Sequence, residues 1–357
     1  MKLVFILAAI LIFGVLVAVH ELGHFLAAKL CGVRVNEFSI GMGPLLWHKE
    51  TEETQYSWRL FPIGGFCAME GEDEDTGDER SFVRQGFWKK FLILAAGSGM
   101  NFLLGLVIVL GLYAGATAFY TDEISGFAPE FALSGENGLM EGDQFYKIDG
   151  YRTYLRGDAS LFLSYHQGET IDLEVIRDGE KVVLEDFPMT RQTYTDSDGK
   201  TYTGFGLYVG AHVNEATFLS RIRYAWYQTL DFVQMVWFSL AQLVSGGASM
   251  EDLSGPVGIV STITEVGASA ETAGAAWRQI FYFAALLAVN LAVMNLLPIP
   301  ALDGGRIFFL LVDALAMLLF KRRVPEKYQA AVNTIGFVVL MGFMLLVTLQ
   351  DVWKLIR

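Results

Sequence analysis

The 357-residue sequence has few charged residues, few cysteines and few histidines, and each shortage excludes certain classes of protein or site. Only 18% of the residues are charged while 53% are hydrophobic, which is typical of a membrane protein and argues against two soluble domains. Basic residues number 26 against 39 acidic ones, with no basic stripe, so we expect no nucleic-acid partner. The two cysteines, Cys31 and Cys67, form no framework and are expected to be free thiols.

Long apolar runs are plentiful, and the first ends in His20-Glu21-Leu22-Gly23-His24. Side chains four apart share one helix face, so His20 and His24 can converge on one metal ion while Glu21 polarises a water. Zinc suits such a site, because catalytic zinc takes three protein ligands and leaves one position for water. Ionisable groups are costly in a membrane helix, which favours function over a chance match. Cleavage of this run as a signal peptide is not expected, since it would remove the site.

A third metal ligand must come from elsewhere, and Asp303 is the best candidate. The other three histidines fall in polar loops or strands: His48, His166 and His212. Asp303 lies in the segment 295–305, Asn-Leu-Leu-Pro-Ile-Pro-Ala-Leu-Asp-Gly-Gly, whose prolines end the preceding helix and whose glycines allow close backbone approach. Irregular backbone at membrane depth must be buried in protein or line a cavity. A simple loop between two membrane helices is the alternative interpretation.

Together these motifs resemble the site-2 protease family of intramembrane zinc metalloproteases, in its bacterial regulator-of-sigma-E branch with a single PDZ domain. The likeness covers nearly the whole chain and includes Ser-Gly-Pro-Val-Gly-Ile at 254–259. It implies that Zn²⁺ is bound by His20, His24 and Asp303 and that Glu21 is catalytic. It also implies that Asn290 and Asn295 help to handle the substrate. Further substrate-binding candidates are Gly64 and Gly65.

The expected fold is a polytopic α-helical membrane protein with about four transmembrane helices, a membrane-associated β-hairpin region and an extracytosolic PDZ-like α+β domain. In chain order we expect a first membrane helix at 1–28, the hairpin region at 31–87, a second membrane helix at 91–113, the PDZ-like domain at 121–213, an amphipathic helical segment at 218–250, a third membrane helix at 275–297, the motif loop with a short helix at 298–320 and a fourth membrane helix at 332–349. Whether 218–244 and 307–320 enter the bilayer stays open.

The hairpin region contains two extended, strongly apolar segments, 33–47 and 56–69. The family resemblance implies a membrane-associated hairpin whose edge strand receives the substrate. A soluble β-layer that caps the helices is the alternative. In the second membrane helix, Asn101 follows several small residues that allow close helix packing. Asn101 is expected either to lie against the site or to form a packing hydrogen bond.

The insert after the second membrane helix carries most of the net charge. Between residues 114 and 220 there are 18 Asp and Glu against 7 Lys and Arg, which gives −11 of the total −13. Residues 139–150 resemble the core of PDZ domains, strands are expected at 170–177 and 181–185 across an Asp178-Gly179 turn, and 204–209 is a candidate last strand. No clear carboxylate-binding glycine loop is present, so a steric filter is favoured over capture of peptide tails.

Lys and Arg near the span ends set the expected orientation. Ten gather on one side and four on the other. This places the protein in the cell inner or plasma membrane with the hairpin in the cytosol, the PDZ-like domain and both termini outside, and the active site toward the cytosolic leaflet.

The expected activity is zinc-dependent cleavage of transmembrane segments of other proteins. Expected partners are membrane lipid and single-pass membrane proteins, such as a clipped anti-sigma factor or signal-peptide remnants, as the resemblance implies. Two other classes compete: a PDZ-bearing scaffold with a structural metal, and a metal or proton transporter. Glu21 disfavours the scaffold, because a structural zinc needs no base. Polar residues concentrated near one leaflet disfavour a transport path.

Overall fold

The computed structural model describes residues 2–72, 74–129, 131–195, 201–210, 213–247, 249, 253–321 and 326–356. His212 lies outside the described residues. The chain divides into two compact units, one of residues 1–108 with 236–357 and the other of residues 109–235.

The first unit is built from helices α1 (Lys2–Cys31), α2 (Phe87–Tyr113, which continues into the second unit), α5 (Pro256–Ser269), α6 (Ala273–Leu296), α7 (Asp303–Phe320) and α8 (Glu326–Ile356). Among the described residues, four helices are long and apolar enough to cross a membrane: Leu3–Cys31, Phe87–Tyr113, Ala273–Leu296 and Tyr328–Ile356. Helices suit this setting because they satisfy their backbone hydrogen bonds internally. The four spans agree with the expected class of fold. Helix α5 was not anticipated.

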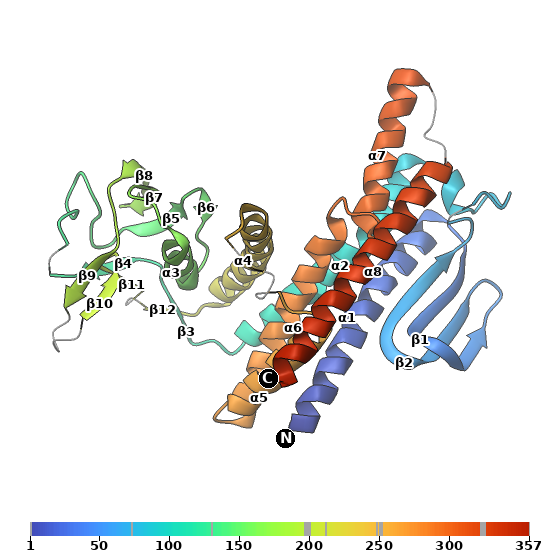
Figure 1. The fold of residues 1–357 in the computed structure, drawn as a ribbon, viewed down its shortest axis with the longest axis horizontal. Coiled ribbons are helices and arrows are strands. Elements are labelled where there is room, and N and C mark those ends of the chain that lie inside the picture. The colour runs from blue at the N-terminus through green and yellow to red at the C-terminus, as the bar shows by residue number, and fades with distance from the viewer. Residues whose placement is uncertain are drawn as a thin grey trace. The chain divides into compact units, whose positions relative to one another are not determined.

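Two long bent strands, β1 (Val35–Glu50) and β2 (Gln55–Met69), form the hairpin beside α1 (Figure 1). Residues 37–40 of β1 pair on one side with 65–68 and on the other with 55–58 of β2. The segment 65–69 therefore pairs on one side only within the described part of the chain, and it forms an edge of the sheet. The opposite end of the hairpin exposes large apolar side chains, including Met42, Leu45, Leu46, Trp47, Trp58 and Phe61.

The hairpin packs directly on α1. A Cβ added to Gly14 of α1 would lie 2.5 Å from the carbonyl oxygen of Pro62 in β2, so only glycine allows this approach. Cys31 and Cys67 are both buried in the apolar cluster where the ends of α1 and β2 meet α2, and both are free thiols, as expected. The hairpin is thus part of the core of the first unit.

The second unit contains a four-stranded antiparallel sheet in the order β6-β5-β7-β8 and a helix, α3 (Arg156–Tyr165). The sheet strands are β5 (Gln144–Ile148), β6 (Tyr151–Arg152), β7 (Ile171–Arg177) and β8 (Glu180–Phe187). Smaller pairs are β3 (Ala118–Tyr120) with β12 (Val213–Glu215), β4 (Ile124–Phe127) with β11 (Leu207–Val209), and β9 (Gln192–Thr195) with β10 (Thr201–Gly204).

The turn between β7 and β8 has the expected geometry. Asp178 and Gly179 both have positive φ, 50° and 85°, which matches the twist of a two-residue hairpin turn. The expectation for 204–209 is only partly right, because Leu207–Val209 forms β11 but β12 follows it and pairs with β3. Because β12 pairs with β3, the last strand of this unit lies beside its first strand.

Helix α4 (Phe218–Ser245) begins in the second unit and is not among the four candidate spans. The amide of Gln234 bonds both backbone groups of Arg152, accepting from its N–H at 3.1 Å and donating to its carbonyl at 2.6 Å. The ring of Tyr224 stacks on Phe119 with centroids 4.1 Å apart. These contacts hold the first part of α4 against its own unit.

Candidate metal centre

Three side chains from two helices converge in the first unit. The Nε2 atoms of His20 and His24 on α1 are 3.2 Å apart, and each lies 3.2 Å from Oδ2 of Asp303 at the start of α7. The two histidines expected to share a helix face and the aspartate expected as the third ligand therefore converge on one point. Among the described residues, this is the group of His, Cys, Asp and Glu side chains that could hold a metal ion.

The triangle has the size that zinc requires. Ligand atoms about 2.0–2.1 Å from a tetrahedral zinc are about 3.3 Å from one another. Two imidazole nitrogens and one carboxylate oxygen also form a ligand set of catalytic zinc sites, with a fourth position for water. Oδ2 of Asp303 is buried and makes no hydrogen bond other than its contacts with the two imidazoles. The residues present therefore fit zinc in both chemistry and spacing.

His24 is oriented by the backbone of α2. Its side chain is buried, and its Nδ1 donates to the carbonyl oxygen of Ile93 at 2.8 Å. This hydrogen bond selects the tautomer that leaves Nε2 free to bind a metal. The Nδ1 atom of His20 is also buried but has no hydrogen-bond partner in the part of the chain that the structure describes.

A glycine of α2 makes room for both imidazoles. A Cβ added to Gly97 would lie 2.3 Å from Nε2 of His24 and 2.7 Å from Cε1 of His20. Gly23, the residue before His24 on α1, approaches the backbone of Ala96 so closely that a Cβ would lie 2.4 Å from its carbonyl oxygen. The small residues of α2 therefore serve the site as well as helix packing.

The loop before α7 positions Asp303. Gly304 and Gly305 pass beneath this loop, where added Cβ atoms would lie 2.1 Å and 2.4 Å from the carbonyl oxygens of Leu297 and Ile299. The expected close approach is confirmed. Ala301 adopts a left-handed conformation (φ 74°), and its N–H donates to Oδ1 of Asn333 on α8 at 2.7 Å.

Glu21 lies between the metal ligands and the hairpin. A Cβ added to Gly65 would lie 3.5 Å from Cγ of Glu21, so the edge segment of β2 passes beside this side chain. Gly64 precedes it with φ 98°. The structure thus brings Gly65 to Glu21, across 43 residues of chain.

The remaining candidates lie elsewhere or make no bonds that assign them a role. His48 is exposed in β1, and His166 of the second unit pairs with Asp149 at 2.7 Å. Asn290 and Asn295 are partly buried on α6, and within the described chain neither side chain has a recorded hydrogen bond.

Sequence reasoning missed several groups that build the site. The Ile93 carbonyl carries no side-chain information and could not have been found. Asn333 could have been, because an amide within a membrane span is a functional candidate. The pair formed by Arg306 on α7 and Glu72, in the loop after β2, also joins the hairpin to the helix that starts at Asp303.

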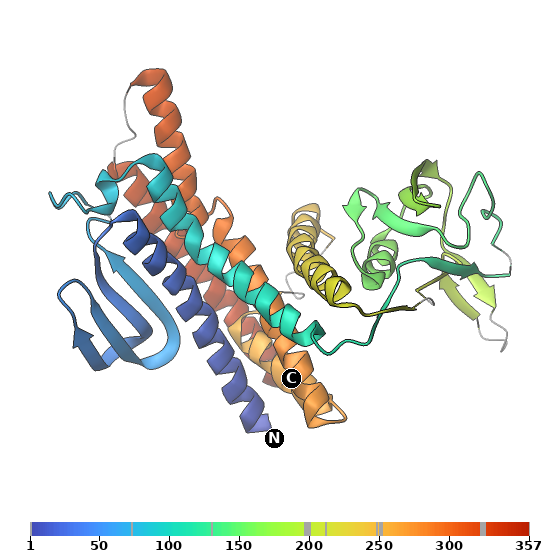
Figure 2. The same ribbon diagram turned by 180° about the vertical axis from the view of Figure 1, so that it is seen from behind.

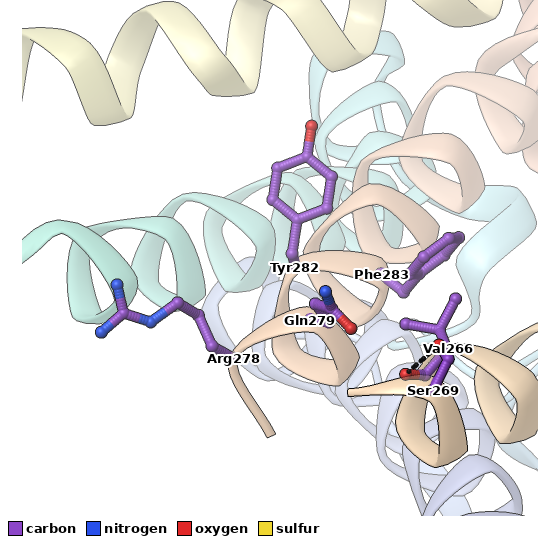
Figure 3. A pocket seen from close by; sticks show the side chains of 6 residues that line it. All are labelled: Val266, Ser269, Arg278, Gln279, Tyr282 and Phe283. Atoms are coloured by element: carbon purple, nitrogen blue, oxygen red, sulfur yellow. Dashed lines mark hydrogen bonds between the residues drawn. The ribbon is translucent and has the colours of Figure 1, made fainter. Parts of the chain in front are cut away.

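A cavity of about 400 Å³ lies apart from these ligands, between the end of α5 and the start of α6 (Figure 3). Its lining residues are Val266, Ser269, Arg278, Gln279, Tyr282 and Phe283. None of them is a metal-ligand or catalytic candidate, so the candidate chemistry lies at the triangle of ligands.

Comparison with known proteins shows the family to which the chain belongs. The model of peptidase family M50 matches residues 8–343. A Clostridium perfringens protein named "Putative zinc metalloprotease" is 38% identical over 349 residues, covering 98% of both chains. "Regulator of sigma-W protease RasP" of Bacillus subtilis is 29% identical over 433 aligned positions, and "Zinc metalloprotease RasP" of Shouchella clausii is 31% identical over 438, each covering 98% of this chain. The chain therefore belongs to peptidase family M50, the site-2 proteases, and is an intramembrane zinc metalloprotease.

Proposed function

We propose that this protease cuts transmembrane segments of other membrane proteins at a zinc ion held by His20, His24 and Asp303, with Glu21 as the general base. The observation that carries the proposal is the triangle of ligand atoms with 3.2 Å sides. Its size matches tetrahedral zinc, and Glu21 lies one residue after the first ligand. The scaffold and transporter alternatives do not account for a zinc protease with this arrangement.

When bound, zinc supplies Lewis acidity to the scissile carbonyl and to the attacking water. Glu21 takes the proton of that water and later returns it to the leaving amine. Asp303 and the two imidazoles would supply three ligands to the ion and leave its fourth position to water or substrate. The hydrogen bond from Nδ1 of His24 to the Ile93 carbonyl favours the tautomer whose Nε2 can bind the metal.

A helical substrate hides its carbonyl groups in hydrogen bonds four residues apart, so it must unwind before it can be cut. The one-sided edge of β2 near Gly64 and Gly65 offers backbone groups for an added strand directly beside Glu21. Asn290 and Asn295 on α6 supply further amide partners. Strand addition would compensate the hydrogen bonds that unwinding removes.

The hairpin and the metal ligands face the cytosolic leaflet in this proposal, and the second unit lies outside the cell. The excess of Lys and Arg near one set of span ends supports the orientation. Both chain ends lie at the same end of the first unit (Figure 1, Figure 2), which supports placing both termini outside.

Orientation can be tested with single introduced cysteines. Cys31 and Cys67 are buried, so the parent protein gives a low labelling background. Glu180→Cys at the exposed start of β8 should react with an impermeant thiol reagent in intact cells. Glu52→Cys at the hairpin turn should react only after permeabilisation. The reverse pattern would invert the proposed topology.

The second unit is proposed to be a PDZ-like domain that selects substrates by the size of their outer part. Its expected boundaries, 121–213, contain the four-stranded sheet and α3. The substrates proposed are single-pass membrane proteins already clipped outside, such as an anti-sigma factor, or remnants of signal peptides. The B. subtilis relative is named a regulator of sigma-W protease, which supports the first choice. Deleting 121–213 should admit unclipped substrates; if only clipped forms are still cut, the filter lies elsewhere.

Purified full-length Glu21→Gln protein tests the general base. We expect it to retain zinc while cleavage of a membrane-spanning substrate falls by roughly 10²–10⁴-fold, the usual contribution of a positioned base. Glu265→Gln, an exposed carboxylate on α5, is the control and should cleave normally. Normal cleavage by Glu21→Gln would remove the base assignment without affecting the ligand assignment.

A further inference from the structure

Asn101 of α2 is almost fully buried, at 1% exposure, yet neither its amide nitrogen nor its amide oxygen has a hydrogen-bond partner among the described residues. An unsatisfied buried polar group costs about 1–3 kcal/mol, and native proteins rarely leave one without protein or water. The packing hydrogen bond considered from the sequence is therefore not formed with the described residues. Asn101 needs another partner.

Its position on α2 shows where that partner lies. One turn earlier, the Cβ position of Gly97 is 2.7 Å from Cε1 of His20 on α1. One turn later, the Cβ position of Gly105 is 2.6 Å from Cγ2 of Val289 on α6. Residues four apart on a helix differ by about 40° in direction, so Asn101 faces the seam where α1 and α6 both pack on α2.

The Asn101 side chain leans toward the turn that begins at Gly97, because helical side chains tilt toward the helix N-terminus. The ring of His20 lies against that turn, and its buried Nδ1 has no partner either. The hydroxyl of Ser98, three residues before Asn101, is a third buried polar group without one. Three unpaired polar groups therefore belong to this turn or lie against it.

We propose that these groups enclose one buried water, which accepts a hydrogen bond from Nδ1–H of His20 and donates one to Oδ1 of Asn101. A buried water makes two to four hydrogen bonds, and this site offers three partners. Asn101 is then the positioning residue that does for His20 what the Ile93 carbonyl does for His24: it selects the tautomer whose Nε2 is free for metal. The inference rests on the proposed role of His20 as a zinc ligand.

Zinc release from purified full-length protein, measured with a chromophoric chelator, tests the role. Asn101→Leu has nearly the same volume but no polar atom, and loss of such a partner typically weakens metal binding 10–100-fold. We expect release to be faster by about that factor, with one zinc per chain still bound and the thermal midpoint unchanged or raised. Asn101→Asp retains an acceptor and should release zinc at the wild-type rate or more slowly.

Thr264→Val is the matched control, because it removes a buried hydroxyl on α5 that bonds only the Val260 carbonyl of its own helix. It should leave release unchanged. Wild-type release from Asn101→Leu, or equal acceleration in the Leu and Asp variants, would overturn the proposal. If Asn101→Leu does not fold, the smaller Asn101→Ala takes its place with the same expectations.

Histidine labelled with ¹⁵N adds a spectroscopic readout. In wild type, His20 should give an Nδ1–H resonance shifted by a hydrogen bond, and Asn101→Leu should move that resonance alone. An unmoved resonance would contradict the inference. Failure of the underlying ligand assignment would look different, because His20→Ala protein would then keep its zinc.

Discussion

Two clusters of buried or partly buried polar residues, one in each unit, are arranged in opposite ways. In the first unit, His20, His24 and Asp303 direct three ligand atoms at one point, and Oδ2 of Asp303 has no other bond. In the second unit, the carboxyl groups of Asp158 on α3 and Asp231 on α4 interact with each other.

Local donors also serve the second cluster. Oδ2 of Asp158 accepts from the backbone N–H groups of Tyr154 and Leu155 at 2.6 and 2.8 Å, and Asp231 accepts from Gln228 at 3.1 Å. Convergence of three ligand atoms on one point distinguishes a metal site from a cluster in which local donors bond the carboxyl groups and which joins α3 to α4.

The largest effect is expected from removing a converging ligand. Asp303→Ala should lose most of its zinc and reduce cleavage to background, because two imidazoles alone leave the ion with half of its usual ligands. Zinc content by elemental analysis and cleavage of a membrane-spanning substrate measure the two losses. Asp313→Ala, a carboxylate further along the same helix, should keep its zinc. Full zinc and activity in Asp303→Ala would show that the third ligand is another residue.

A smaller but still large effect is expected from filling the space beside the imidazoles. The added methyl group of Gly97→Ala would lie 2.3 Å from Nε2 of His24, so the ring must move. We expect zinc affinity to fall at least about tenfold, as for other losses of ligand orientation. Gly99→Ala on the same helix meets no atom within 4 Å and is the control. Equal zinc affinity in both variants would mean that the ligands tolerate displacement.

The third effect concerns pH and the second unit. Burial and the neighbouring Asp158 raise the pKa of Asp231 to about 8, from an ordinary value near 4. The pKa of Asp231 is higher in the folded state than in the unfolded state. The protonated carboxyl group therefore contributes its full stabilisation of the fold below pH 4, and this contribution is lost as the pH rises toward 8. The contact between α3 and α4 should therefore loosen between pH 5 and pH 8.

Asp231→Asn should abolish that dependence, because the amide stays neutral at every pH. Hydrogen exchange of the α3 and α4 amides in full-length protein, corrected for intrinsic rates, should show an opening free energy that falls by about 1–3 kcal/mol in wild type only. Asp186→Asn, a carboxylate in β8, is the control and should keep the wild-type profile. A wild-type opening free energy that does not change with pH would contradict the raised pKa of Asp231.

The smallest effect is expected where an ion pair supports the first cluster from outside. Glu72→Gln should weaken the contact between the loop after β2 and Arg306 of α7, one turn beyond Asp303. Zinc should remain bound, and cleavage should fall about two- to fivefold, since a partly exposed pair contributes about 0.2–1 kcal/mol. Glu53→Gln, which loses a more exposed pair with Lys29, should cleave normally. An equal loss of cleavage in both variants would show that the effect does not depend on the contact near Asp303.

Features of the site whose geometry is local could be predicted from the sequence. Helical periodicity places His20 and His24 on one face without reference to the rest of the chain. The run of prolines and glycines around Asp303 predicts a helix end followed by close backbone approach, as the structure shows at Gly304 and Gly305. Four apolar helices of membrane length follow from composition alone.

Which surfaces of the helices and strands pack together could be learned only from the tertiary structure. The Ile93 carbonyl, the space at Gly97 and the contact of Gly65 with Glu21 depend on how α2 and β2 align with α1. Helix α5 also escaped sequence reasoning, because the carboxylate that binds its first turn, through the N–H of Gly258, belongs to Asp351 near the end of α8. Local propensity contains no information about such alignment, since close packing between distant segments sets it.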